Sequence, residues 1–239
     1  MNKRLYSWYF LREYFFPRGC GICCKMLLTK EEAMYGLCEE CSKSIIIEDG
    51  ERCESCGRPL ISEIGRCLPC RRTEGASCDR IISIFPYLGR YIKLLRAFKF
   101  DRSLGAGHFL AEKILEALKL LPMEEMKNPV LIPIPPRAGK IRKTGWDQID
   151  ALAGILKQKP DTPRIKSCLK RQASQTQKSL DRKDRQINLK GRIIAKKNIP
   201  KECILFDDVI TTGSTMNACA AALKDGGAEK VFGICLFYD

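Results

Sequence analysis

Residues 202–215 read Glu-Cys-Ile-Leu-Phe-Asp-Asp-Val-Ile-Thr-Thr-Gly-Ser-Thr, and this stretch decides the fold of the C-terminal part of the chain. The apolar residues 203–206 predict a buried strand that delivers two adjacent acids, Asp207 and Asp208. A loop and a helix are expected to follow. A helix start concentrates unpaired N–H donors and partial positive charge, so it favours a phosphate dianion. The pattern therefore predicts a site for a phosphorylated sugar, with the carboxylates accepting hydrogen bonds from two neighbouring hydroxyls.

The loop supplies hydroxyls and backbone N–H groups for this site. Gly213 lets the backbone approach a ligand closely. A simpler interpretation stays open, in which the acids and the hydroxyl-rich turn only cap a helix. The loop residues expected to contact the phosphate are Thr211, Thr212, Gly213, Ser214 and Thr215.

Strands and helices are predicted to alternate around this stretch. Apolar patterning predicts strands at 80–87, 130–134 and 230–237, and helices at 90–98, 104–121, 146–157 and 215–224. This order indicates an α/β domain with a mostly parallel sheet covered on both faces. Ligands of such sheets bind at the carboxyl ends of the strands.

Cysteines mark a different kind of module at the other end of the chain. Ten of the fourteen cysteines lie in the first 78 residues, and four pairs share the spacing Cys-x2-Cys. This spacing points two sulfurs of a tight turn at one ion, and thiolate sulfur suits zinc. We expect two closed structural zinc sites built from Cys20, Cys23, Cys38, Cys41, Cys53, Cys56, Cys67 and Cys70.

The simplest pairing joins the first four of these cysteines in one site and the last four in the other. An interleaved pairing remains open from sequence. Disulfides need an oxidising compartment, and iron–sulfur motifs usually pack their cysteines more tightly. Cys24 is an ambiguous spare ligand. The late cysteines Cys168, Cys203, Cys219 and Cys235 sit among apolar residues and are expected in the core.

A change of composition at 71–78 predicts a linker. It separates an N-terminal helix and zinc module, residues 1–75, from the α/β domain, residues 76–239. Residues 1–16 predict a short amphipathic helix that docks on its own domain or contacts a membrane. They lack the features of a signal peptide, and no apolar run reaches the roughly 20 residues that span a bilayer. We therefore expect a cytoplasmic location.

Residues 202–215 resemble the phosphoribosyl pyrophosphate (PRPP) motif of the type I phosphoribosyltransferases. A multi-Cys-x2-Cys module ahead of such a domain is similar to the ComF (ComFC) family of competence proteins. The likeness covers nearly the whole chain. Further matches are Tyr87-Leu-Gly-Arg90, Lys99-Phe100, Leu131-Ile-Pro-Ile-Pro135, and the spaced residues Arg171, Gln175, Gln177, Leu180, Arg182, Arg185 and Asn188.

One stretch departs from the family pattern. The family usually carries Arg-Gly-Phe-Asn-Gln after the proline-rich strand, whereas this chain has Thr144-Gly-Trp-Asp-Gln148. The basic residue is absent at 144, and Asp replaces Asn at 147. These differences put in doubt any contact that the missing arginine would make.

The resemblance implies binding of PRPP with Mg²⁺ and transferase chemistry in which pyrophosphate leaves C1. Lys99 and Arg137 are the candidate catalytic residues that stabilise the departing polyanion. Asp207 and Asp208 are expected to bind the ribose, and a basic loop at 136–145 to close over the ligand. No pocket for an acceptor is recognisable, so turnover is open and a PRPP sensor is an alternative.

The charge distribution supports a second hypothesis. The net charge is +14, and residues 137–201 alone hold 19 Lys or Arg against 5 Asp or Glu. Such a segment attracts a phosphate backbone, although Trp146 is its only aromatic for base stacking. The ComF resemblance implies single-stranded DNA, a helicase-like protein and a recombination mediator as partners. The chain lacks the Gly-x4-Gly-Lys-Ser/Thr loop of an ATP motor, and its single histidine, His108, is expected to have no catalytic role.

Overall fold

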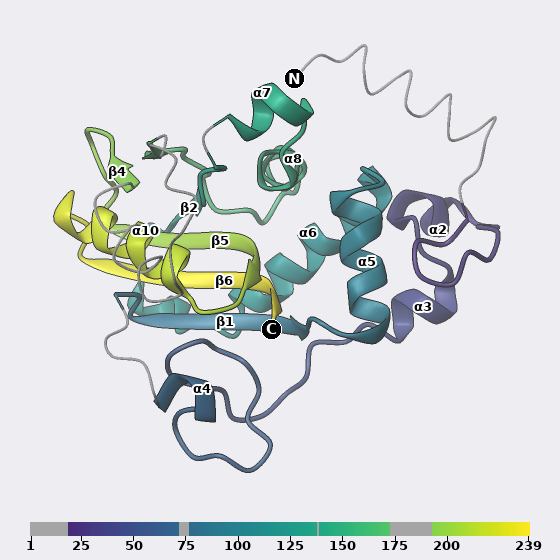
Figure 1. Cartoon of the computed structure of the whole chain (residues 1–239), viewed down its shortest axis with the longest axis horizontal. Helices are drawn as coiled ribbons and strands as arrows, with labels where there is room; N and C mark the ends of the chain where they lie inside the picture. The colour runs from purple at the N-terminus through teal and green to yellow at the C-terminus, as the bar shows by residue number, and fades with distance from the viewer. Residues whose placement is uncertain (1–18, 72–76, 138, 173–192) are drawn as a thin grey trace, which may run out of the picture.

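The computed structural model describes residues 19–71, 77–137, 139–172 and 193–239 (Figure 1). The helix predicted at 1–16, part of the linker, and the family-like residues from Gln175 to Asn188 lie outside these ranges.

A four-stranded parallel sheet forms the centre of the molecule (Figure 1). Its order is β1-β6-β5-β2, and every neighbouring pair is parallel. The strands read as near-continuous apolar runs, which is typical of parallel strands buried on both faces. They are β1 (Arg80–Pro86), β6 (Lys230–Tyr238), β5 (Glu202–Ile210) and β2 (Val130–Pro133).

Each face of the sheet has its own apolar core. Helices α5 (Gly89–Lys99), α6 (Leu104–Leu118) and α8 (Gln148–Leu156) cover one face. Helix α10 (Ser214–Asp225) and a small antiparallel pair, β3 (Leu169–Arg171) and β4 (Ile193–Ala195), cover the other. The structure thus confirms the predicted α/β class with a parallel sheet covered on both faces. No described helix combines the length and apolar character needed to cross a bilayer.

The structure differs from the prediction in the length of β5 and in several short elements. Strand β5 continues to Ile210, so Asp207 and Asp208 lie within the strand and do not follow it. Strands β3 and β4 and helix α7 (Lys140–Thr144) were not predicted. With three to five residues each, they are too short to show a period.

The cysteine-rich segment forms two units with the same local backbone. Cys20 N donates to Lys25 O at 2.7 Å, and Cys53 N donates to Arg58 O at 2.9 Å. Each unit adds a short helix at its later cysteines, α3 (Glu39–Lys43) in the first and α4 (Leu68–Arg71) in the second. The first unit also contains α2 (Lys30–Tyr35). The segment is therefore a tandem of two similar turns.

The two units pack at different places (Figure 1). The first lies against α5 and α6, where Tyr35 Oη donates to Glu112 Oε2 at 2.7 Å. The second covers the free edge of β1, where Ser83 N donates to Gly57 O at 3.1 Å and Ser83 Oγ donates to Cys56 O at 2.5 Å. Covering an edge strand removes its unpaired backbone groups from solvent.

Candidate functional site

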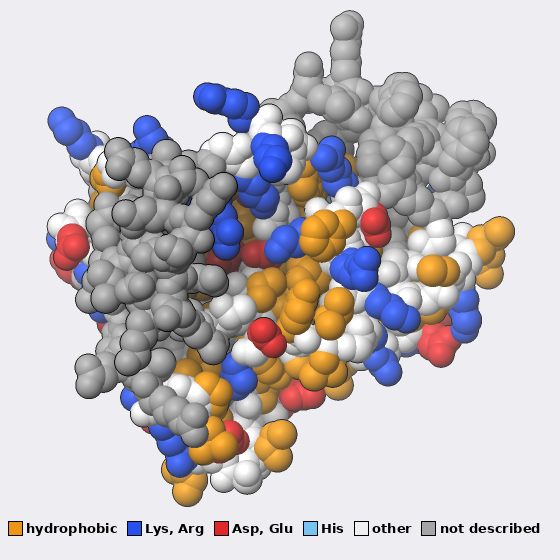
Figure 2. All heavy atoms as spheres, in the orientation of Figure 1, with side chains coloured by type: hydrophobic (Ala, Val, Ile, Leu, Met, Phe, Trp, Pro, Cys, Tyr) orange, Lys and Arg blue, Asp and Glu red, His pale blue; other side chains and the backbone are white. Residues whose placement is uncertain are grey.

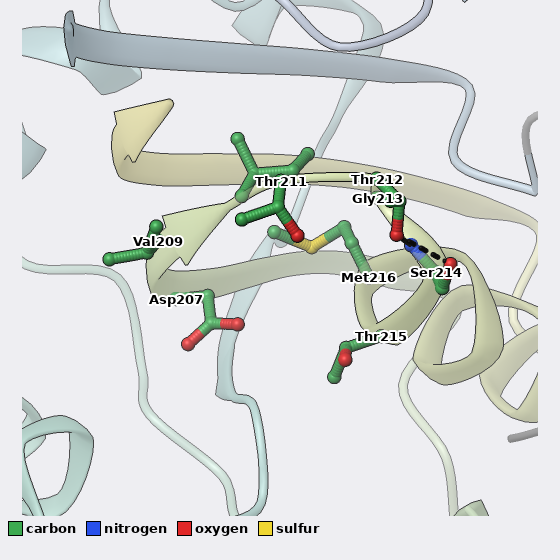
Figure 3. A pocket seen from close by; sticks show the side chains of 9 residues that line it. Asp207, Val209, Thr211, Thr212, Gly213, Ser214, Thr215 and Met216 are labelled. Atoms are coloured by element: carbon green, nitrogen blue, oxygen red, sulfur yellow. Dashed lines mark hydrogen bonds between the residues drawn. The ribbon is translucent and has the colours of Figure 1, made fainter. Parts of the chain in front are cut away.

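The acid pair lies at the carboxyl end of β5, beside a small hollow. The hollow is lined by the last residues of β5 and the first turn of α10 (Figure 3). Asp207 lines it, whereas the Asp208 side chain is buried on the other side of the strand, 9% exposed. Adjacent residues of a strand point to opposite faces, which explains this division. The remaining lining residues are Val209, Ile210, Thr211, Thr212, Gly213, Ser214, Thr215 and Met216.

The loop between β5 and α10 has the backbone of an anion cradle. Gly213 adopts φ +71°, a left-handed conformation that glycine accepts without strain, and it is the N-cap of α10. Thr212 Oγ1 and Ser214 Oγ lie 2.7 Å apart, and both hydroxyls flank the helix start (Figure 3). Within the described residues, the amides of Thr215 and Met216 have no hydrogen-bond partner in the protein. The loop therefore presents free donors and a helix dipole.

Asp208 is held by two donors from other elements. Lys99 Nζ, at the end of α5, donates to Asp208 Oδ2 at 2.8 Å. Gln148 Nε2, the first residue of α8, donates to the same oxygen at 2.7 Å. The structure thus brings Lys99, a candidate catalytic residue, to the acid pair.

The two carboxyl groups differ in their proton affinity. Burial and then the charge of Asp208 raise the pKa of Asp207 well above its ordinary value. Burial also opposes ionisation of Asp208, but the charge and hydrogen bonds of Lys99 outweigh it, so the pKa of Asp208 lies below its ordinary value. Asp208 is thus the charged partner of Lys99, and Asp207 is the acid of the pair that holds a proton more strongly than usual.

Gln148 and Asp147 belong to the site, although the sequence prediction did not assign them to it. Asp147 caps α8 by accepting hydrogen bonds from the amides of Ile149 and Asp150, both at 3.0 Å. Lys140 Nζ donates to Asp147 Oδ2 at 2.8 Å and also to Gln148 Oε1. Their place in the family-like stretch 144–148 was the one indication of a role available from sequence.

Thr144, at the position where the family carries arginine, makes hydrogen bonds to nearby parts of the chain. Thr144 Oγ1 lies 2.9 Å from the carbonyl oxygens of both Lys140 and Trp146, and its one proton is donated to one of them or shared between them. Arg102 Nη2 donates to Thr144 O at 2.8 Å, and its guanidinium lies 5.9 Å from the Trp146 ring centroid. A guanidinium from another part of the chain therefore lies beside residue 144.

Arg137 is placed differently from Lys99. It follows β2, the neighbour of β5 in the sheet, so it lies at the same strand-end edge as the acid pair. Its side chain is exposed and makes no hydrogen bond or ion pair with the described residues. Lys and Arg side chains gather over α7 and α8 on this face (Figure 2). The basic loop predicted at 136–145 is thus largely the short helix α7.

The eight predicted cysteine ligands form two groups. Within each group all sulfur atoms lie within 4.8 Å of one another. Cys23 Sγ and Cys38 Sγ are 3.6 Å apart, and Cys56 Sγ and Cys67 Sγ are 3.7 Å apart. Zinc–sulfur bonds of about 2.3 Å in a tetrahedron put the sulfurs roughly 3.8 Å apart, so the groups fit such an ion. The groups are Cys20, Cys23, Cys38 and Cys41, and Cys53, Cys56, Cys67 and Cys70.

This grouping answers two questions left open by the sequence. The simple pairing is confirmed and the interleaved one is wrong. Cys24 has φ +64°, and it takes the place that Gly57, with φ +73°, takes in the second unit. Cys24 therefore serves the turn and is not in the group of four. Burial opposes ionisation of Cys20, but amide donors, the first from Cys23, lower its pKa to about 7.

The four late cysteines lie in the core, as the sequence predicts. The late cysteines Cys168, Cys203, Cys219 and Cys235 are all buried. His108 lies in the first half of α6. Burial and then Lys159 lower the pKa of His108, which favours its neutral form.

Three curated proteins are similar to this chain over most of their length. Competence protein F of Haemophilus influenzae is 31% identical over 210 residues, covering 83% of this chain and 89% of that protein. Competence protein ComFC of Streptococcus pneumoniae is 25% identical over 212 residues, covering 86% and 88%. DNA utilization protein YhgH of Escherichia coli K12 is 26% identical over 227 residues, covering 90% and 96%.

No protein-family model matches the chain. The similarity to competence protein F nevertheless covers most of both chains, at a level of identity that indicates common descent. The chain therefore belongs to the ComF family of competence proteins.

Proposed function

We propose that this chain binds PRPP, or another ribose 5-phosphate compound, with Mg²⁺ at the carboxyl end of β5. The observation that carries the proposal is the juxtaposition of Asp207 with the free amides and hydroxyls at the start of α10. The loop would hold the 5-phosphate and Asp207 the ribose hydroxyls, while Asp208 would keep Lys99 in place behind the strand. Mg²⁺ would be held mainly by oxygens of the ligand, and it would neutralise the pyrophosphate charge.

Lys99 is the protein group proposed to face the charge that develops as pyrophosphate leaves. It is already fixed on Asp208, so it needs little reorganisation when a polyanion binds. Arg137 is proposed as the second cation, from the neighbouring strand end. Release of pyrophosphate with an acceptor would make the chain a transferase, and binding without release would make it a PRPP sensor.

The cellular role proposed is DNA uptake or utilisation. The relatives are named for competence and DNA utilisation, and the chain carries a net charge of +14. Single-stranded DNA is the proposed polyanionic partner, with helicase-like and recombination-mediator proteins as further partners. DNA binding that survives removal of the Asp207 and Asp208 charges would favour an adaptor that works without the ribose-phosphate site.

Titration calorimetry with PRPP, with and without Mg²⁺, tests the site. Wild type is expected to release heat only with Mg²⁺. Asp207→Asn together with Asp208→Asn is expected to weaken binding about 100-fold or more, because the ribose loses the Asp207 carboxylate and Lys99 loses the partner that positions it. Asp225→Asn, an exposed acid at the far end of α10, is the matched control and should bind as wild type does.

A wild type that gives no heat with PRPP and Mg²⁺ would refute the proposal. Should the double variant fail to fold, Asp207→Asn alone decides the matter, because Asp207 borders the hollow and has no ion pair to lose.

We also propose that each cysteine group binds one structural Zn²⁺. Cys38→Ser in the first group and Cys67→Ser in the second are each expected to reduce the bound zinc from about two ions per chain to about one. Cys24→Ser is the control and should keep both ions, because Cys24 lies outside the group. Metal analysis of the purified proteins measures this, and full zinc content in Cys67→Ser would contradict it.

A further inference from the structure

Arg58, in the second cysteine unit, reaches the end of the central sheet. It lies two residues after the predicted ligand Cys56, and its Nη2 donates to the carbonyl oxygen of Asp239 at 2.6 Å. Its guanidinium also lies over the Tyr238 ring, with Cζ 5.2 Å from the ring centroid. One side chain therefore fixes both residues at the end of β6.

The residue that Arg58 holds is bonded to the start of the phosphate loop. Asp239 N donates to the carbonyl oxygen of Ile210 at 3.0 Å. Ile210 is the last residue of β5, immediately before Thr211, and it lines the hollow. Two consecutive hydrogen bonds thus connect Arg58 to the loop.

Arg58 is also tied to the cysteine group itself. The Cys53 amide donates to the carbonyl oxygen of Arg58 at 2.9 Å, and the Gly57 amide donates to the carbonyl oxygen of Cys53 at 2.8 Å, so Arg58 closes the turn that carries Cys53 and Cys56. Groups that contact metal-bound residues from outside fix their orientation. The position of Arg58 therefore depends on an intact second group.

In the first cysteine unit, the residue equivalent to Arg58 makes no such contact with the sheet. Lys25 has the place of Arg58 in the tandem, because each residue's carbonyl accepts from the first cysteine amide of its unit. Lys25 Nζ pairs with Glu40 at 2.7 Å, and their side chains are 64% and 78% exposed. The repeated turn does not itself require a buried cation there. The half-buried place of Arg58 reflects its contacts with β6.

We infer that Arg58 is a positioning residue for the phosphate loop and that it links the second cysteine unit, but not the first, to ligand binding there. Without Arg58, Asp239 is no longer held on its outer side, and residues 210–213 gain conformations that a ligand must suppress on binding. The effect on affinity rests on the proposed function, whereas the effect on the motion of the loop does not.

Three variants test the affinity: Arg58→Ala, Arg58→Lys and Lys25→Ala. With PRPP and Mg²⁺ as the probe, Arg58→Ala is expected to raise the dissociation constant about tenfold, and Lys25→Ala to leave it unchanged. Arg58→Lys keeps the charge but loses the planar pair of donors, so it should restore part of the affinity. Equal weakening by Arg58→Ala and Lys25→Ala would overturn the inference.

Linkage also works in the opposite direction. PRPP is expected to slow the release of one of the two metal ions to a chromogenic chelator, and this protection should disappear in Arg58→Ala. A purely structural role of Arg58 would speed metal release with and without PRPP alike.

Amide hydrogen exchange without ligand separates this inference from the proposed function. Arg58→Ala is expected to speed exchange at residues 210–216 while leaving α8 unchanged. If wild type fails to bind PRPP, the proposed function falls and this exchange comparison still decides the inference. Unchanged exchange at 210–216 in a folded Arg58→Ala or Arg58→Lys would refute it.

Discussion

Gly57→Ala is expected to destabilise the folded protein by about 4 kcal/mol, a large part of the stability of a typical domain. A Cβ atom at this position would lie 2.1 Å from Ile81 O and 2.6 Å from Ile82 Cα. These are backbone atoms of β1, so they cannot turn aside as a flexible side chain would. The φ of +73° adds strain for any residue with a side chain. Urea unfolding of the two proteins measures the difference.

Gly89→Ala is the matched control for this prediction. Gly89 also has a positive φ, +53°, but a Cβ there would have no atom within 4 Å. Its replacement should therefore cost only the conformational strain, about 1 kcal/mol. Similar losses in the two variants would show that Gly57 is not packed on β1 as the structure describes, and that the second unit is held elsewhere.

Much of the fold follows from local sequence because its strands are buried on both faces. Residues 130–133 and 231–238 carry no charged side chain and are flanked by breakers or charges, so their patterns predict strands. The prediction ended β5 too early because it relied on an uninterrupted apolar run. Asp207 and Asp208 break the apolar run, yet Asp207 still pairs with Cys235 of β6, and the pairing continues at Val209 and Ile210. Polar side chains at a functional edge thus hide the true end of a strand.

The docking of the cysteine units was not predictable from sequence. The spacing of the cysteines predicts a tight turn in each unit, and both turns form. Nothing in the spacing says that Gly57 lies on β1 or that Tyr35 bonds to Glu112 of α6. These contacts join residues far apart in the chain, and no local period reports them.

The site was predictable in its loop and not in its supporting side chains. The string from Asp207 to Thr215 is contiguous, so one motif contains it. The donors to Asp208 come from the end of α5 and the start of α8, and only the folded chain brings Lys99 and Gln148 together. The aspartate at position 147, where the family has asparagine, is explained by its neighbours in the fold: it caps α8 and forms an ion pair with Lys140.

Lys99→Met is expected to lower the free energy of unfolding by about 2 kcal/mol at neutral pH. It leaves the Asp208 carboxylate, 9% exposed, with no opposite charge in its ion pair. Breaking a buried pair costs about 3–5 kcal/mol, and the 30% exposure of the Lys99 side chain reduces this. Lys201→Met removes an exposed pair with Glu229, 68% and 69% exposed, and should change stability by well under about 1 kcal/mol.

The pH dependence of this loss identifies Asp208 as its source. In wild type the pKa of Asp208 is lower in the folded protein than in the unfolded chain, where it is about 3.9. The ionised Asp208 therefore stabilises the fold fully above about pH 3.9, and this stabilisation is lost as the pH falls through the pKa of the folded protein. Without Lys99, the hydrogen bonds from Gln148 and Asp207 remain, but burial, which has the largest effect, is no longer opposed by a positive charge and raises that pKa. The contribution then changes sign, and the variant loses stability as pH rises above about 4.

The difference in stability between wild type and Lys99→Met should therefore grow from pH 4 to pH 7. The raised pKa of Asp207 makes both proteins less stable as pH rises, so it largely cancels in the difference. Adding Asp208→Asn to Lys99→Met removes the stranded charge, while the asparagine oxygen still accepts from Gln148 Nε2. The double variant should recover most of the lost stability and show no growing difference with pH. A double variant as unstable as Lys99→Met would mean that Lys99 stabilises the fold through its aliphatic packing, and that the acid pair does not depend on its charge.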